Sequence, residues 1–254
     1  CAGTQTLWYS GGRPDGTPTL RNAEGPVHGA FFQQSSFATH ALATERNVVK
    51  VAEDLPLELL GPLGCGVQTG AGAVVHSLRV GTGASLAVFG AGGVGLSAVM
   101  AARICGAGMI IAIDTRPERL ALALRLGATH VLDAREGDVA GRIRSLHPDG
   151  VQFSLETSAT VEGFQGALDC LAKRGTCGLV AVPQLGAPFS FRPIPLLAGR
   201  RLLGIIFIPR LLDWYRAGLL PLEAMSEYFD FADIATALGA SRDGRVVKPI
   251  LRMT

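Results

Sequence analysis

The spacing of hydrophobic residues changes near residue 69, and the two parts of the chain predict different structures. Residues 1–64 are rich in glycine and proline and contain short alternating runs at 37–43 and 47–51. Alternation of apolar and polar positions is typical of half-buried strands, while glycine and proline favour turns. We therefore expect strands and turns in this part of the chain, without a long helix.

Beyond this part, apolar runs of strand length alternate with segments of helical spacing. Strands are expected at 85–90, 109–114, 130–133, 151–156, 175–182, 201–207 and 246–251, and helices at 67–80, 95–105, 118–126, 139–146, 161–172, 211–218 and 222–228. Apolar strands that alternate with helices indicate a parallel sheet covered on both faces. The expected fold class is therefore α/β, with a doubly wound parallel sheet.

Composition supports a globular chain and excludes several classes of function. Of the 254 residues, 48% are hydrophobic and 17% are charged, which is unlike a disordered protein. The formal net charge of +2 argues against nucleic-acid or membrane-surface partners. The longest uncharged stretch, 80–102, is interrupted by glycines. It is better explained as a buried strand followed by a buried helix than as a membrane span.

The cysteine pattern bears on the compartment. Five cysteines are scattered along the chain and form no CxxC pair, which favours reduced thiols and a cytoplasmic setting. No signal peptide is recognisable. The chain opens on Cys1, without an initiator Met and in a segment of loop composition. We therefore expect it to be truncated at its N-terminus.

A glycine motif lies between the strand expected at 85–90 and the helix that follows. Its residues are Gly90, Ala91, Gly92, Gly93, Val94 and Gly95, a GxGxxG pattern. The first glycine permits a tight turn, the second lets a diphosphate approach the backbone, and the third lets the helix pack closely on the strand. Amides at the start of the helix attract phosphate. In this strand–turn–helix context the motif predicts a dinucleotide-binding Rossmann unit.

Asp114 indicates which dinucleotide is bound. It ends the next expected strand, about 20 residues beyond the motif, where a carboxylate accepts hydrogen bonds from the adenine ribose. Its charge would repel the 2′-phosphate of NADP, so we expect NAD. Arg116 and Arg119 lie close by in the sequence. Either of them could instead face a phosphate.

Several further segments share a pattern with one known family. They are GCGVQTGAGA at 64–73, DTRPERL at 114–120, DGR at 243–245 followed by KPILRM at 248–253, FFQQSSFATHALATERNVVKV at 31–51 and GGRPDG at 11–16. Together with the glycine motif they resemble the zinc-type medium-chain alcohol dehydrogenases, and most of all the aryl- (benzyl-) alcohol dehydrogenase branch. The resemblance extends over nearly the whole chain.

The resemblance implies both a fold and a reaction. It implies a partial GroES-like β domain at 1–66, an NAD-binding Rossmann domain at 67–206 and a return to the first domain at 207–254. The reaction is hydride transfer between a primary or aryl alcohol and NAD. Cys65 matches the family's second cysteine ligand of the catalytic zinc, a role that suits a thiolate. Cys1 matches the last of four structural-zinc cysteines. Without the resemblance, Cys65 would be interpreted as a small buried hydrophobic residue.

The resemblance also implies a set of residues around the cofactor. Thr69 matches a threonine near the nicotinamide, Arg119 a basic residue at the adenine ribose, and Lys248 a basic residue that reaches the pyrophosphate. The remaining matches follow strands that line the cofactor cleft or lie beside the carboxamide; they are Thr157, Ser158, Val182, Ile206 and Phe207.

Much of the family's zinc chemistry has no counterpart in this sequence. In the full-length family, zinc held by Cys65 and two upstream ligands lowers the pKa of the alcohol before hydride passes to NAD. Those upstream ligands, three of the structural-zinc cysteines and the proton-relay residues do not occur here. One thiolate does not hold a zinc ion. We therefore expect the chain to lack both metal sites, to bind NAD weakly and to oxidise alcohol only at background.

Two other functions stay open. A non-catalytic dinucleotide-binding module becomes the better interpretation if translation begins near Cys1. A zinc-free, NADPH-dependent reductase of the same superfamily is disfavoured by Asp114 and Cys65. A methyltransferase is disfavoured because its xDxGxGxG-type turn does not occur.

The expected partners are a small alcohol or aldehyde and a second copy of the chain. The apolar strand at 201–207 lies in the region through which family members dimerise, and an apolar edge strand invites pairing. We therefore expect a homo-oligomer. The aromatic residues Trp8, Phe31, Phe32 and Phe207 are too few to define which alcohol is used.

Overall fold

The computed structural model describes residues 11–13, 15–30, 39–40, 48–181, 194–204 and 211–253. The chain divides into two compact units. We call the larger one, Leu57–Glu227 with Ala240–Pro249, the sheet unit. The terminal unit consists of Cys1–Pro56, Tyr228–Gly239 and Ile250–Thr254.

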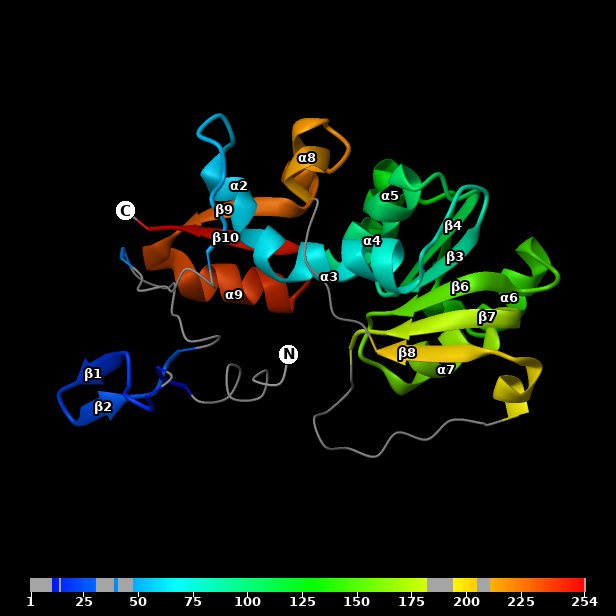
Figure 1. The fold of residues 1–254 in the computed structure, drawn as a ribbon, viewed down its shortest axis with the longest axis horizontal. Coiled ribbons are helices and arrows are strands. Elements are labelled where there is room, and N and C mark those ends of the chain that lie inside the picture. Colours follow the sequence, from blue (N-terminus) through cyan, green and yellow to red (C-terminus); the bar gives the residue numbers. More distant parts are fainter. Residues whose placement is uncertain are drawn as a thin grey trace. The chain divides into compact units, whose positions relative to one another are not determined.

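A six-stranded parallel sheet is the centre of the sheet unit (Figure 1). Its strands are β3 (Ser85–Phe89), β4 (Met109–Asp114), β5 (His130–Asp133), β6 (Val151–Glu156), β7 (Leu171–Leu179) and β8 (Arg201–Gly204). They lie in the order β5-β4-β3-β6-β7-β8, and each neighbouring pair is parallel. Strands β3, β4 and β5 therefore follow one another toward one edge of the sheet. Strand β6 then lies on the other side of β3, and β7 and β8 follow it toward the opposite edge. This reversal between β3 and β6 is the point at which open α/β sheets bind ligands.

Helices cover both faces of this sheet, as the apolar strands predicted. They are α3 (Gly66–Gly72), α4 (Gly93–Ile104), α5 (Pro117–Leu126), α6 (Val139–Leu146) and α7 (Val161–Asp169). Successive side chains of β3 belong to different clusters, because side chains alternate across a strand. Leu86 and Val88 pack with residues of α3, α4 and α5, whereas Ala87 and Phe89 pack with residues of α6 and α7.

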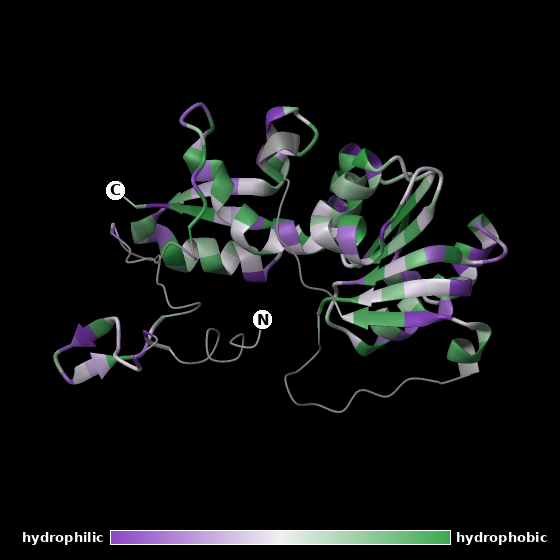
Figure 2. Ribbon diagram, in the orientation of Figure 1, coloured by the Kyte–Doolittle hydropathy of each residue, from purple (hydrophilic) through white to green (hydrophobic). Residues whose placement is uncertain are grey.

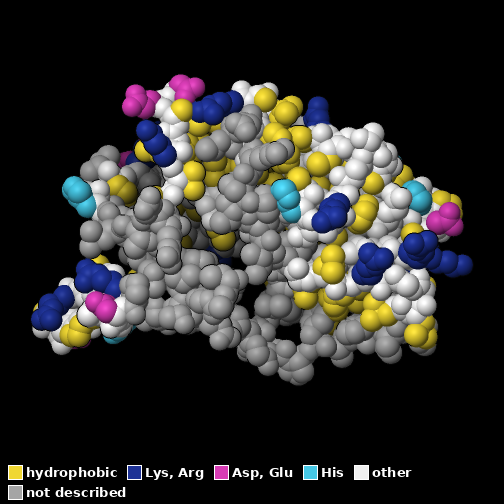
Figure 3. Space-filling view, in the orientation of Figure 1, with side chains coloured by type: hydrophobic (Ala, Val, Ile, Leu, Met, Phe, Trp, Pro, Cys, Tyr) yellow, Lys and Arg dark blue, Asp and Glu magenta, His cyan; other side chains and the backbone are white. Residues whose placement is uncertain are grey.

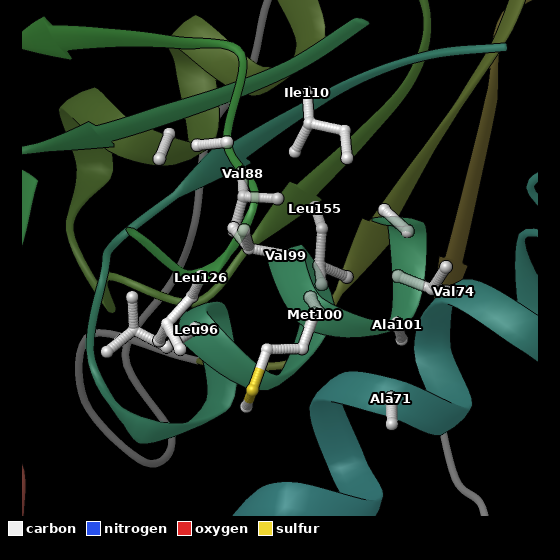
Figure 4. Close-up of a cluster of buried hydrophobic side chains, with 14 of the residues drawn as sticks. Ala71, Val74, Val88, Leu96, Val99, Met100, Ala101, Ile110, Leu126 and Leu155 are labelled. Atoms are coloured by element: carbon white, nitrogen blue, oxygen red, sulfur yellow. The ribbon is translucent and has the colours of Figure 1, made fainter. Parts of the chain in front are cut away.

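Both clusters are closely packed. Figure 4 shows Val99 and Met100 of α4 beside Val88 and Leu155 of the sheet, and all four side chains are at most 1% exposed. The central strands are correspondingly hydrophobic in Figure 2. This core fixes the carboxyl ends of the strands, where the candidate site lies.

Helix α3 crosses α4 at very short range. A methyl group on Gly70 would lie 1.9 Å from the carbonyl oxygen of Val94, so only glycine permits this approach. The helix continues through a π-helical turn at Ala73–Ser77. Together these segments correspond to the helix expected at 67–80, but the helix ends at Ser77, earlier than expected.

The remaining elements are short. Strand β1 (Leu20–Asn22) pairs antiparallel with β2 (Gly25–Val27), β9 (Ser226–Asp230) pairs with β10 (Lys248–Arg252), and the other α-helices are α2 (Leu57–Leu60), α8 (Leu211–Arg216) and α9 (Ile234–Arg242). Short 3-10 turns occur at Gly61–Gly64, Ala134–Glu136, Ile194–Ala198, Leu222–Met225 and Phe231–Asp233. Among the described residues, no helix has both the length and the apolar character needed to cross a membrane.

Charged side chains do not gather into one field on the face that Figure 3 shows. In its coloured part, Lys and Arg side chains lie as separate groups among hydrophobic and uncharged ones. This distribution agrees with the small formal net charge of +2.

Several expected boundaries were wrong. The helix expected at 161–172 ends at Asp169, because Leu171 already pairs with Val151 and β7 begins there. A helix was expected at 222–228, but from Ser226 the chain forms β9, which pairs with β10. Helix α9 was not expected at all. The last strand was expected at 246–251 and instead spans Lys248–Arg252.

The alternating runs expected near the N-terminus form no strand among the described residues. Residues 48–51 form no strand, and Val48 and Val49 are 54% and 68% exposed. An apolar–polar alternation produces a strand only where a partner strand pairs with its backbone and another layer covers its hydrophobic face. Most of the run at 37–43 lies outside the described residues.

Candidate functional site

The glycine motif forms the turn between β3 and α4. Gly90 has a φ of +96°, a conformation that favours glycine, and its amide donates to Ile113 O over 2.7 Å. A methyl group on Gly90 would lie 2.8 Å from Thr157 Oγ1, and one on Gly95 would lie 1.8 Å from Gly90 O. The first and third glycines are therefore required by contacts within the protein.

Gly92 differs from these two glycines because, in the part of the chain that the structure describes, no atom lies within 4 Å of the position of an added methyl group. It is the N-cap residue of α4, and the first turn of that helix contains no acidic side chain. The amides at the start of a helix lack intrahelical partners and carry partial positive charge. The turn therefore presents an accessible backbone with anion-binding character.

Asp114 ends β4 beside this turn and is 8% exposed. Its Oδ2 accepts a hydrogen bond of 2.7 Å from the amide of Ala91, and its Oδ1 accepts one of 3.0 Å from the amide of Arg116. Arg119 Nη1 lies 3.7 Å from Oδ2, and Arg119 Nε is buried without a hydrogen-bond partner in the described part of the chain. The structure thus brings the acid that the sequence singled out directly onto the glycine turn.

The loop after β6 braces the other side of the turn. Thr157 Oγ1 donates to Phe89 O over 2.9 Å or to Gly90 O over 3.0 Å, and the Thr157 amide donates to Phe89 O over 2.8 Å. A methyl group on Gly90 would also lie 2.9 Å from the amide nitrogen of Ser158. Thr157 and Ser158 therefore form a wall of the turn.

Glu156, which is not among the site residues expected from the sequence, organises this loop. Its side chain is 1% exposed, and its Oε1 accepts hydrogen bonds from the amide of Ser158, over 2.7 Å, and from the Ser158 hydroxyl. Burial raises the pKa of the Glu156 carboxyl above 4.5, and the hydrogen bonds from Ser158 and the Ala159 amide oppose the rise. The one available signal was an acidic residue at the end of an apolar strand.

Lys248 extends over the start of α4. A methyl group on Gly93 would lie 2.6 Å from Lys248 Cε, and one on Gly66 would lie 3.1 Å from Lys248 Nζ. These two glycines leave the space that the lysine side chain occupies. A cation therefore lies next to the accessible backbone of the turn, far along the sequence from it.

Cys65 and Thr69 belong to the start of α3. Cys65 is exposed and precedes the helix, and its carbonyl accepts a hydrogen bond of 2.9 Å from the Thr69 amide. Across the described ranges, no group of three His, Cys, Asp or Glu residues is arranged to hold a metal ion. Cys65 is therefore a single candidate ligand there. The other expected site residues, Cys1, Val182, Ile206 and Phe207, lie outside the described residues.

Comparisons with known proteins agree with this geometry. The pattern of the zinc-binding dehydrogenases matches residues 93–219. A geraniol dehydrogenase from Castellaniella defragrans is 45% identical over 249 residues, covering 94% of this chain and 67% of that protein. The chain belongs to the zinc-binding alcohol dehydrogenase family.

Two crystal structures support the same assignment. One, an alcohol dehydrogenase zinc-binding domain protein from Burkholderia ambifaria, has a TM-score of 0.95 at 46% identity. The other, benzyl alcohol dehydrogenase from Acinetobacter calcoaceticus, has a TM-score of 0.94 at 40% identity. Each comparison covers 100% of this chain and 71% of the other. The expected α/β fold class and the family resemblance are thus confirmed, and the chain is an oxidoreductase by family.

The glycine turn of this dehydrogenase yields a test with matched substitutions. Gly95→Ala should lower the free energy of unfolding by about 2–3 kcal/mol, because its methyl group would overlap the Gly90 carbonyl. Gly92→Ala should lower it by at most about 1 kcal/mol, because the methyl group points into open space and only the poorer N-capping of alanine remains. Urea denaturation of both variants measures the difference. Equal losses would contradict the contacts described for the turn.

The buried acid predicts a pH dependence of stability. Above pH 4.5 the unfolded state releases the Glu156 proton first, whereas the folded state, with its raised pKa, still holds it. Stability should therefore fall as pH rises through this range. Glu156→Gln removes this contribution, so wild type should lose stability relative to the variant as pH rises above about 4.5. Urea denaturation at several pH values checks this, and a pH-independent difference would refute it.

Proposed function

We propose that the sheet unit binds NAD and that, in the protein with its zinc sites complete, hydride passes between a primary alcohol and this cofactor. The observation that supports this most is the hydrogen bond from the Ala91 amide to Asp114 Oδ2, 2.7 Å long. It places an acid next to an open glycine turn at the reversal point of the sheet. That combination suits a ligand with a diphosphate and a neighbouring ribose.

The described residues fit such a dinucleotide. The amides that begin α4 and the Lys248 ammonium are suited to the diphosphate, because helix N-termini and lysine both favour anions. The Asp114 carboxylate, which has lone pairs beyond those already used, accepts hydrogen bonds from ribose hydroxyls. Thr157 and Ser158 confine the turn from the β6 side. In this proposal Thr69 lies toward the nicotinamide, as the family resemblance implies.

The surroundings of Asp114 favour NAD over NADP. The guanidinium of Arg116 donates to the carbonyl of Asp243, and Arg119 is paired with Asp114 itself. Both arginines that could have met a 2′-phosphate are therefore engaged with groups of the protein. A carboxylate at the adenine ribose repels the additional 2′-phosphate of NADP.

The substrate proposal rests on two relatives whose names specify an alcohol. Geraniol and benzyl alcohol are both primary alcohols with the carbinol carbon next to a π system. We extend this class to the present chain. Bound NAD would supply the hydride acceptor, and the residues described here would hold and orient it.

Zinc belongs to the family, but the described residues of this chain do not fit a complete zinc site. Cys65 is the single candidate ligand among them, and we derive no step through the metal. We retain Cys65 as a proposed catalytic-zinc ligand of the whole protein. Cys1 is retained as a proposed structural-zinc ligand, and Val182, Ile206 and Phe207 as proposed cofactor contacts.

Further parts of the proposal concern organisation. Domains at 1–66, 67–206 and 207–254 remain the proposed division. We also propose a homo-oligomer, because β8 is an edge strand of the sheet and Leu203 on it is 37% exposed.

A cytoplasmic setting is supported by Cys65, Cys105, Cys170 and Cys177, all of which are free thiols. Burial raises the pKa of the Cys177 thiol to about 11, so this thiol stays protonated.

Asp114→Asn tests the proposed cofactor. Wild type should bind NADH more tightly than NADPH, and the substitution should lower this preference at least about tenfold by removing the charge that holds the ribose and repels phosphate. Titration of NADH and NADPH fluorescence measures both affinities. The matched control is Asp133→Asn, because Asp133 lies next to Asp114 in register on β5 but pairs with Arg135. A preference for NADPH in wild type, or an unchanged preference in Asp114→Asn, would count against NAD.

A further inference from the structure

Arg116 connects two parts of the candidate site that are far apart in the sequence. Its backbone amide donates to Asp114 Oδ1 over 3.0 Å. Its guanidinium Nη1 donates to the carbonyl of Asp243, the residue that follows the last residue of α9. Carbonyls at a helix C-terminus lack intrahelical partners and carry partial negative charge, so an arginine is well suited to them.

Gly244 makes room for this contact. It has a φ of +73°, and a methyl group there would lie 2.3 Å from both Cζ and Nη1 of Arg116. The chain reverses at this point, because the Gly244 amide donates to Ser241 O over 3.1 Å and the Val246 amide to Ala240 O over 3.2 Å. The Arg116 side chain therefore packs directly against a defined turn.

This turn leads into Lys248, at the start of β10. Residues 240–249 belong to the same compact unit as the glycine turn and Arg116. Lys248 in turn lies over Gly93 and Gly66, as described above. The Arg116 side chain thus holds the segment that leads to Lys248. The Arg116 backbone amide orients Asp114, the acid at the proposed ribose position.

We propose that Arg116 is a positioning residue for the dinucleotide. By holding the Asp243 carbonyl, it fixes residues 243–248 so that the Lys248 ammonium stays beside the diphosphate. Its side chain does not contact the ligand. Glu118, whose Oε1 lies 3.9 Å from Nη1, is an exposed neighbour of the guanidinium and does not replace Asp243. The inference rests on the proposed function, because it assumes that this turn binds a dinucleotide.

The test compares binding of NADH with binding of adenosine, which lacks the diphosphate. Arg116→Met should raise the Kd for NADH about five- to tenfold, because the lysine–phosphate contact loses its fixed geometry. The Ki of adenosine as a competitor should stay within about twofold, because the backbone amide of residue 116 still orients Asp114. Arg116→Lys should recover part of the affinity. The control is Arg125→Met, at an exposed arginine in the last turn of α5, which should bind both ligands like wild type.

A second comparison separates positioning from a general loss of structure. In a Lys248→Met background, Arg116→Met should add less than about twofold to the Kd for NADH, because the group that it positions is already gone. Melting temperatures show that each variant is folded, and if Arg116→Met is not, Arg116→Lys is carried through the same cycle. Additive losses, an equal loss of adenosine binding, or an unchanged Kd for NADH would each overturn the inference. Absence of NADH binding by wild type would instead overturn the proposed function itself.

Discussion

The hydrogen bond between the Ala91 amide and the Asp114 carboxylate is the constraint on which the candidate site depends. It joins the turn after β3 to the end of β4, two strands that lie side by side in the sheet. Because Asp114 is buried, its charge needs such partners to be tolerated there. The same bond that satisfies the acid also brings it to the amides of the turn. Protein stability and ligand geometry are thus linked at one contact.

The glycines around this contact have different physical reasons to be glycine. Gly95 and Gly70 permit close backbone approaches within the protein, whereas Gly92 leaves space that none of the described residues occupies. Gly93 and Gly66 make room for Lys248, and Gly244 makes room for Arg116. The glycine motif in the sequence therefore does not show what each glycine does. The contacts around each glycine in the structure show it. Within the glycine motif, Gly92 is the position left open by the described residues, and it lies where the proposed diphosphate would bind.

Much of the sheet unit could be predicted from sequence because its strands are apolar on both faces. The bounds of β4, β5, β6 and α6 match the expected ranges, since each is an apolar or periodic run between clear breaks. The boundary between α7 and β7 could not be predicted, because the pairing of Leu171 with Val151 decides it. Strand β9 and helix α9 depend likewise on partners distant in the sequence.

The site shows the same division. The glycine turn and Asp114 follow from local sequence, whereas the contacts of Arg116 with Asp243 and of Lys248 with Gly93 join segments more than 100 residues apart. Sequence left Arg116 as a possible phosphate partner, and did not reveal that its guanidinium donates to the backbone carbonyl of Asp243. The role of Glu156 could not be predicted, because it depends on the burial of this side chain, and the residue type alone does not indicate burial.

A crystal structure of this chain with bound ADP-ribose, the part of NAD without nicotinamide, would show whether the glycine turn and Asp114 bind the dinucleotide. We expect the diphosphate within hydrogen-bond distance of the amides that begin α4, and a ribose hydroxyl on the Asp114 carboxylate. Electron density for the ligand at another place in the sheet unit, with no contact to Asp114, would contradict it.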